Sequence, residues 1–280
     1  MDIKTAINEA KYLLKCNNIK SPELDSELLM SKVLKKNRSY ILLNLHKNLK
    51  KKNLSNFINL IKERSRGKPI AYLIEKKEFW DYEFKINEGV LIPRPDTEIM
   101  VEQVLDLTKN KPKLRILDIG TGSGCIILSI LKERKNYKGI GIDISKKCID
   151  MCKINTFNLN LTNRVKFFKS DVDNFIDAKY DLILSNPPYI SQIDLKCLEK
   201  DVYDFEPKSS LDGGVDGLSE IRKVIDKSSE LIKINGRLIL EIAFDQKFRV
   251  KKLLKDRGFY INKVLKDLAN NDRCIVSTKI

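Results

Sequence analysis

The chain has 280 residues, of which 42% are hydrophobic and 32% charged, and its formal net charge at pH 7 is +15. This composition is typical of a globular protein with a buried core, and the longest apolar stretch, Cys125 to Leu131, is far shorter than the roughly 20 residues that a membrane-spanning helix needs. The N-terminal residues show neither a secretory nor a transit pattern, so we expect a cytoplasmic protein without membrane association. The six cysteines form no CxxC pair, so we expect reduced thiols and no metal site.

Residues 1–75 are predicted to form a helical domain. Serine, proline and an acid at Ser21-Pro22-Glu23 make a favourable helix start. No glycine occurs before Gly67, which suits a small helical bundle that packs or binds a partner. Helical spacing puts the following apolar residues on buried faces: Ile3, Ala6, Ile7, Ala10, Leu13 and Leu14 in the first helix, and Leu24, Leu28, Leu29 and Val33 in the second.

A short hairpin or extended linker is predicted over residues 76–95. Aromatic residues are frequent there, including Phe79, Trp80 and Tyr82. Pro93-Arg94-Pro95 is too rigid for a helix or a central strand, because proline fixes its own backbone and restricts the residue before it. This segment therefore separates the helical domain from a second domain over residues 96–280.

Short apolar segments alternate with helical ones in the second domain. Such a pattern predicts an α/β fold with a doubly wound, mostly parallel sheet. The last two strands have only a brief connection, which predicts an antiparallel pair at one edge. The predicted strands are 114–119, 139–144, 165–168, 182–185, 237–242, 259–265 and 273–278, and helices are predicted at 126–134, 146–155 and 218–231.

A glycine-rich turn follows the first strand of this sheet. Its sequence is Gly120-Thr121-Gly122-Ser123-Gly124, and glycines there allow a tight turn and let a ligand approach the backbone closely. Asp143 ends the next strand, where its carboxylate can hold a pair of ribose hydroxyls. Asp171 ends the third strand, at the edge where open parallel sheets bind their ligands and where an adenine could lie.

Two cofactors fit such a turn, a dinucleotide and S-adenosylmethionine. The spacing is GxGxG rather than GxGxxG, so the third glycine is misplaced for a pyrophosphate. Asp118 lies just before the turn, where a carboxylate suits a cationic amino-acid group better than a pyrophosphate. S-adenosylmethionine is therefore the predicted cofactor, and a purely structural turn is the main alternative.

The tetrad Asn186-Pro187-Pro188-Tyr189 ends the fourth strand and is the most specific motif of the chain. An amide or aromatic amino nitrogen is a poor nucleophile, because its lone pair is delocalised. The side-chain oxygen of Asn186 and the backbone carbonyl of Pro187 can accept both hydrogens of such an NH2 group, while Tyr189 can pack flat on a planar target. The tetrad predicts methylation of a planar amide or amine nitrogen, although a rigid turn would use similar residues.

The chain resembles, over nearly its whole length, the HemK-type (PrmC-type) protein-(glutamine N5) methyltransferases that modify peptide chain release factors. Three residues depart from the usual family pattern, Glu75, Asp96 and Ala243, and all three lie outside the two main motifs. Besides the glycine-rich turn and Ser185 to Ile190, the resemblance rests on Asp25-Ser-Glu-Leu-Leu, Gly67 to Leu73, Phe79-Trp80, Val90 to Glu98, Glu206-Pro207, Gly213-Gly214, Asp216-Gly217-Leu218, Glu241 with Gln246, Lys266-Asp-Leu and Asp272-Arg273.

The resemblance implies a class I S-adenosylmethionine-dependent methyltransferase fold, with a Rossmann-like seven-stranded sheet and a small all-α N-terminal domain that binds the substrate. It implies that the substrate is the glutamine of the GGQ motif in class I peptide chain release factors. Gly120 to Gly124, Asp143, the Asp171-Val172 turn and Asn186 would contact the cofactor. The tetrad would hold the glutamine, and Arg94, Pro95 and Glu98 would shape the cofactor pocket or the substrate mouth. We expect a monomer.

Three other functions compete with this interpretation. A related enzyme could methylate a glutamine in a ribosomal protein with the same tetrad. An adenine-N6 methyltransferase could use the tetrad on a flipped base, but no further domain remains to bind bases, so we expect no direct DNA binding. A ribosome-associated binding protein without activity would rest on the positive charge alone, which accompanies abundant lysine, asparagine and isoleucine along the whole chain.

Overall fold

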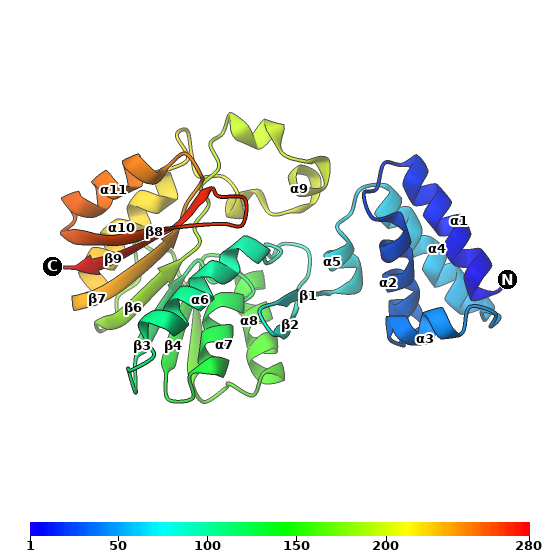
Figure 1. Ribbon diagram of the computed structural model, residues 1–280, viewed down its shortest axis with the longest axis horizontal. Helices are drawn as coiled ribbons and strands as arrows, with labels where there is room; N and C mark the ends of the chain where they lie inside the picture. The colour runs from blue at the N-terminus through cyan, green and yellow to red at the C-terminus, as the bar shows by residue number, and fades with distance from the viewer. The chain divides into compact units, whose positions relative to one another are not determined.

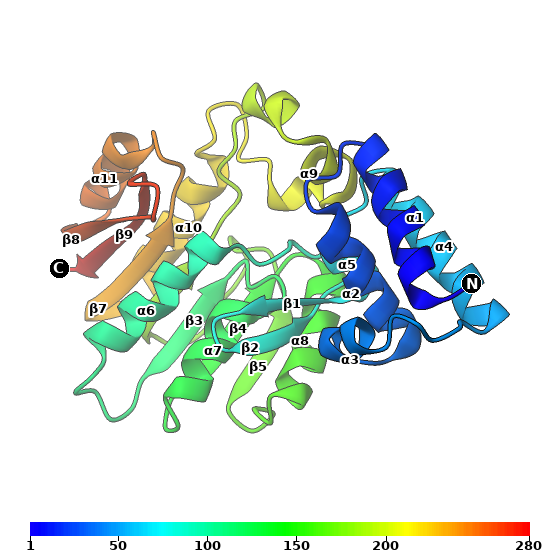
Figure 2. The same cartoon turned by 45° about the vertical axis from the view of Figure 1, so that its right-hand side comes forward.

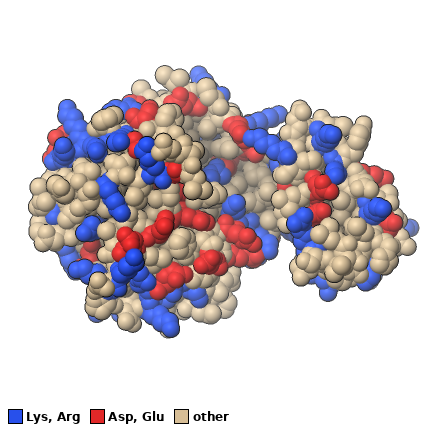
Figure 3. Space-filling model, viewed as in Figure 1, with Lys and Arg blue, Asp and Glu red and all other residues tan.

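The computed structural model describes residues 1–280 and divides into two compact units. The first unit comprises residues 1–76 and 199–205, and the second comprises residues 77–198 and 206–280 (Figure 1). The short segment 199–205 thus belongs to the helical unit although it lies far along the chain, which the sequence did not predict. Lysine, arginine and acidic side chains are interspersed on the visible face of both units (Figure 3).

The first unit is entirely helical. Its helices are α1 (Ile3–Cys16), α2 (Pro22–Leu34), α3 (Arg38–Leu43), α4 (Lys51–Ser65), α5 (Ile70–Ile74) and α9 (Lys200–Phe205). The predicted start of α2 at Pro22 is confirmed, but the Ser21 hydroxyl donates to Asp25 at 3.0 Å instead of capping the helix. None of the helices in the chain is long and apolar enough to cross a membrane.

The predicted buried faces of α1 and α2 are correct in part. Leu14 is fully buried, whereas Leu13 and Leu24 are exposed. The buried side of α2 instead carries Asp25, whose carboxylate accepts a hydrogen bond at 2.7 Å from the guanidinium of Arg64 on α4. A charged pair can replace apolar contacts at this position because each ion satisfies the other's hydrogen-bonding needs.

The second unit is built on a seven-stranded sheet with the strand order β5-β4-β3-β6-β7-β9-β8. The first five strands in this order are parallel, and β9 and β8 are antiparallel to their neighbours. Both the mostly parallel sheet and the antiparallel edge pair are therefore confirmed. The strands are β3 (Arg115–Ile119), β4 (Lys138–Asp143), β5 (Val165–Lys169), β6 (Tyr180–Ser185), β7 (Ile232–Glu241), β8 (Phe259–Lys266) and β9 (Asp272–Lys279).

Helices cover both faces of this sheet (Figure 2). One face packs under α6 (Glu98–Leu107), α7 (Cys125–Glu133) and α8 (Lys146–Asn158), and the other under α10 (Ser219–Leu231) and α11 (Lys247–Asp256). Along β7, Ile239 joins the first core while Leu238 and Leu240 join the second, as alternation in a strand requires. Burial on both faces explains why the central strands β6 and β7 contain apolar runs, at Leu182–Leu184 and Leu238–Leu240.

The predicted hairpin lies beside α8 in the second unit. It consists of β1 (Lys76–Phe79) and β2 (Tyr82–Lys85), and Asn155 of α8 exchanges two hydrogen bonds with the backbone of Lys85, at 2.7 and 3.0 Å. Three short 3-10 helices complete the chain: η1 (Pro95–Thr97), η2 (Asp194–Cys197) and η3 (Lys208–Ser210).

Candidate active site

A cavity of about 450 Å³ opens at the carboxyl ends of β3, β4, β5 and β6. The chain crosses there from the β4 side of β3 to the β6 side, which is the place where doubly wound sheets bind their ligands. Eight of the residues predicted for the site line this cavity: Gly120, Gly122, Asp143, Asp171, Val172, Asn186, Pro187 and Pro188.

The glycine-rich turn leaves open space above its backbone. Gly120 and Gly122 have φ angles of 71° and 58°, a conformation that side chains disfavour. A Cβ atom at either position would meet no atom within 4 Å, so both positions face open space. A ligand can therefore lie directly against the backbone of this turn.

Thr121 and Asp118 support the turn from beneath and do not line the cavity. The hydroxyl of Thr121 donates to Asp118 Oδ2 at 2.7 Å, and the other carboxyl oxygen of Asp118 is buried without a partner. Burial raises the pKa of Asp118 to about 7. Asp118 is not among the residues that line the cavity, and its contact with a ligand stays a prediction. Ser123, which is buried, and Gly124, which is the N-cap residue of α7, do not line the cavity either.

Asp143 connects the ends of β3 and β4. Its Oδ2 accepts from the Gly122 N–H and its Oδ1 from the Ser145 N–H, both at 2.9 Å. A carboxylate offers about four lone-pair sites, so each oxygen keeps one for a ligand hydroxyl. Burial raises the pKa of Asp143. Asp143 can thus bind the glycine-rich turn and, at the same time, two neighbouring hydroxyl groups of a ligand.

The end of β6 places the tetrad against the glycine-rich turn. The Ser185 hydroxyl is fully buried and donates to the backbone carbonyl of Ile119 at 2.8 Å, which ties the end of β6 to the end of β3. The side-chain NH2 of Asn186 donates to the Thr97 hydroxyl oxygen at 3.2 Å. This leaves the Asn186 carbonyl oxygen as the acceptor at the cavity.

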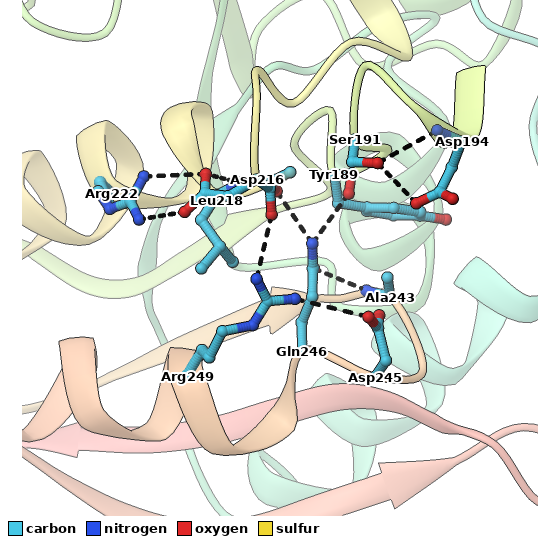
Figure 4. A network of polar contacts seen from close by, with 11 residues as sticks. Tyr189, Ser191, Asp194, Asp216, Leu218, Arg222, Ala243, Asp245, Gln246 and Arg249 are labelled. Atoms are coloured by element: carbon cyan, nitrogen blue, oxygen red, sulfur yellow. Dashed lines mark hydrogen bonds and ion pairs between the residues drawn. The ribbon is translucent and has the colours of Figure 1, made fainter. Parts of the chain in front are cut away.

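Tyr189 is held at both ends, by Glu241 and Gln246, which were not predicted as site residues. Its hydroxyl donates to Glu241 at 3.3 Å, and its backbone carbonyl accepts from the Gln246 side chain at 2.9 Å. Figure 4 shows Gln246 between Tyr189 and Ala243: its amide also donates to the Gly217 carbonyl at 3.0 Å and accepts from the Ala243 N–H at 3.0 Å. Tyr189 does not line the cavity and packs against the core under α10 and α11.

Arg94 and Glu98 also lie outside the cavity lining. Arg94 pairs with the buried carboxylate of Glu206, which also accepts from the Ile92 N–H at 3.3 Å. Glu98 accepts from the Trp80 N–H at 2.7 Å. Both residues therefore fix the chain on either side of Thr97, and their contact with a substrate stays a prediction.

The cysteines and acids of the chain form no metal site. All six cysteines are free, and no group of three or more histidine, cysteine, aspartate or glutamate side chains is placed to hold a metal ion.

Comparison with known proteins identifies the family. Residues 5–74 match the family model described as the PrmC N-terminal domain, and residues 95–200 match the methyltransferase small domain. A release factor glutamine methyltransferase of Buchnera aphidicola subsp. Acyrthosiphon pisum is 39% identical over 279 residues, which are 100% of this chain and 99% of the relative. One of Clostridium botulinum is 40% identical over 282 residues, with both chains covered completely. The chain belongs to the release factor glutamine methyltransferase family.

The fold of this family member also occurs in more distant proteins. The crystal structure of a ribosomal protein L11 methylase from Lactobacillus delbrueckii subsp. bulgaricus superposes with a TM-score of 0.50, covering 72% of this chain and 89% of the other. The two are 16% identical, so the similarity confirms the predicted methyltransferase fold alone.

Proposed function

We propose that the protein transfers a methyl group from S-adenosylmethionine to the side-chain amide nitrogen of the GGQ glutamine in class I peptide chain release factors. The orientation of Asn186 carries this proposal, because its NH2 is bound by Thr97 and its carbonyl oxygen remains for a substrate amide. Full-length relatives at 39% and 40% identity bear the name release factor glutamine methyltransferase. A release factor as substrate also supports a cytoplasmic location for this protein.

The cavity residues fit the proposed cofactor. The open backbone at Gly120 and Gly122 can receive its amino-acid part, and the free lone pairs of Asp143 can accept from its ribose hydroxyls. Val172 is buried except for the surface that it gives to the cavity, and together with Asp171 it can border an adenine. When bound, S-adenosylmethionine supplies an electrophilic methyl group on a sulfonium.

The tetrad can activate the glutamine amide by accepting its two hydrogens. The Asn186 side-chain oxygen and the Pro187 carbonyl are the proposed acceptors, and the proline at position 188 offers no N–H that would compete for them. With both hydrogens held in this way, electron density on the nitrogen can localise towards the methyl group, and the methylated nitrogen would then lose one proton to water. Orientation of this kind is capable of removing roughly 7–11 kcal/mol from a barrier.

Transfer of a labelled methyl group tests the proposal. Purified release factor should be labelled, and release factor with the GGQ glutamine replaced by alanine should not. Equal labelling of both would exclude that glutamine as the target. A purified ribosomal protein and duplex DNA, assayed in parallel, test the two competing substrate classes.

A further inference from the structure

Gln246 is a buried glutamine whose side chain hydrogen-bonds only to the backbone around the tetrad. It lies between β7 and α11, and 2% of it is exposed. Its Nε2 donates to the carbonyls of Tyr189 and Gly217 at 2.9 and 3.0 Å. Its Oε1 accepts from the Ala243 N–H at 3.0 Å (Figure 4). Both hydrogens and the oxygen of this amide are therefore paired, as burial requires.

The three partners of this side chain specify an amide of this length. Two of them are carbonyl oxygens, which need donors, and the third is an N–H, which needs an acceptor. A carboxylate has no hydrogen to donate, a neutral imidazole has one N–H, and an ammonium or guanidinium group cannot accept. Asparagine is shorter by one methylene. Glutamine is thus the side chain that satisfies all three partners at once.

The two prolines of the tetrad make an anchor at Tyr189 important. Pro187 and Pro188 have no N–H, so the backbone there cannot donate a hydrogen bond to a neighbouring segment. Directly after them, the Tyr189 carbonyl is held by Gln246, and the Ile190 N–H donates to the carbonyl of residue 211 at 3.1 Å. The Pro187 carbonyl, one of the two proposed acceptors, therefore lies between the end of β6 and this anchored peptide.

The same amide joins the tetrad to a second wall of the cavity, the segment 212–219. A Cβ atom at Gly217 would lie 2.5 Å from the Tyr189 carbonyl oxygen and 2.8 Å from Gln246 Nε2. The φ angle of Gly217 is 72°, which side chains disfavour as well. The close approach of the two segments thus depends on the glycine and on the amide between them. Three residues of this segment line the cavity: Asp212, Gly214 and Ser219.

We propose that Gln246 is a positioning residue that holds the tetrad against the segment 212–219, so that the Pro187 carbonyl is directed at the substrate amide before it arrives. This inference rests on the proposed function. Gln246 does not line the cavity, so it acts on the reaction through the backbone of Tyr189 and Gly217. Its loss leaves the contacts of Asp143 with the glycine-rich turn in place. The expected defect is therefore in kcat and not in cofactor binding.

The decisive variant is Gln246→Glu, assayed for methyl transfer to release factor with the wild type beside it. Glutamate has the same shape and can still accept from the Ala243 N–H, but it has no hydrogen for the two carbonyls. We expect kcat to fall by about 100-fold, as misplacement at a reacting atom does, with the calorimetric affinity for S-adenosylmethionine retained. Wild-type kcat, or a parallel loss of cofactor affinity, would overturn the inference. Inactive wild type would instead refute the proposed function, so the two failures are distinguishable.

Gln103→Glu is the matched control for the charge that Gln246→Glu buries. Gln103 of α6 is also a buried glutamine, and its Nε2 has no hydrogen-bond partner. The control variant should lose stability, because it too places a charge in the interior, but it should retain kcat. An equal loss of kcat in both variants would assign the effect to the buried charge and contradict the positioning role.

Two uncharged variants keep the inference testable should Gln246→Glu fail to fold. Gln246→Met has a similar length and removes both donors, and it should lower kcat with cofactor affinity retained. Gly217→Ala pushes a methyl group against the Tyr189 carbonyl and should lower kcat as well. Because both changes act on that one carbonyl, the double variant should lose little more activity than either single variant. Losses that multiply would show independent effects and contradict the shared role.

Discussion

Replacing Asn186 with alanine tests the central contact of the proposed mechanism. The change removes the side-chain oxygen that faces the cavity and the NH2 that donates to Thr97 at 3.2 Å. It leaves the glycine-rich turn and the hydrogen bonds of Asp143 in place. We therefore expect methyl transfer to fall while S-adenosylmethionine still binds.

The size of the fall in kcat separates the loss of one hydrogen bond from misplacement of the reacting nitrogen. The loss of one hydrogen bond alone raises the barrier by about 0.5–1.5 kcal/mol, which lowers the rate by roughly tenfold at most. Misplacement of the reacting nitrogen costs about 100-fold in addition. We therefore expect kcat to fall by about 100-fold to 1000-fold.

Single-turnover transfer of labelled methyl to release factor measures this loss, and calorimetric titration measures cofactor binding. Asn158→Ala is the control, because Asn158 is an exposed asparagine at the end of α8. A loss of tenfold or less for Asn186→Ala would refute the positioning role, and a parallel loss of cofactor affinity would assign Asn186 to cofactor binding instead.

Other parts of the structure yield three further predictions. Asp143→Asn should weaken S-adenosylmethionine binding by about 10- to 100-fold, since hydrogen bonds to charged groups contribute about 1.5–3 kcal/mol; unchanged affinity in calorimetry would exclude the ribose contact. Asp25→Asn leaves Arg64 buried without its counter-ion and should destabilise the helical unit by about 3–5 kcal/mol in urea unfolding, whereas a cost below about 1 kcal/mol would show that the pair contributes little. Burial raises the pKa of both Asp118 and Glu241 to about 7, so between pH 5 and 7 the folded chain holds protons that the unfolded chain has released. Stability of the ligand-free protein should therefore fall as pH rises through this window, and a rising melting temperature would contradict it.

The sheet and the cofactor edge were predictable because their signals are local. Central strands buried on both faces contain apolar runs, and a glycine, an acid or an asparagine stands at or near the point where each of β3, β4, β5 and β6 leaves the sheet. Parallel strands bring these ends to one edge, so Gly120, Asp143, Asp171 and Asn186 were expected together before their contacts were known. The cavity lined by all four agrees with this expectation.

The residues that hydrogen-bond to the tetrad without lining the cavity were not predictable in the same way. Thr97, Glu241 and Gln246 are separated from Asn186 by tens of positions, and the contacts of Glu241 and Gln246 with the tetrad exist only after β7 pairs with β6. The family resemblance includes Glu241 and Gln246 without giving either a contact, and Glu241 carries a further signal, since it is an acid at the carboxyl end of a predicted strand, as Asp143 is. Nothing comparable marks α9, whose place in the helical unit depends on tertiary contacts alone.

The anchoring of the tetrad shows how stability is exchanged for orientation. Tyr189 is fixed through its hydroxyl and its carbonyl, and Gly217 leaves room for that carbonyl, since a Cβ there would lie 2.5 Å from it. Acceptors held before the substrate arrives need no reorganisation during the reaction. The burial of Glu241 opposes folding, because its charged form is disfavoured there. Glu241→Gln should therefore raise the melting temperature above pH 7, because an amide at this position carries no charge to bury; an unchanged or lower melting temperature would contradict it.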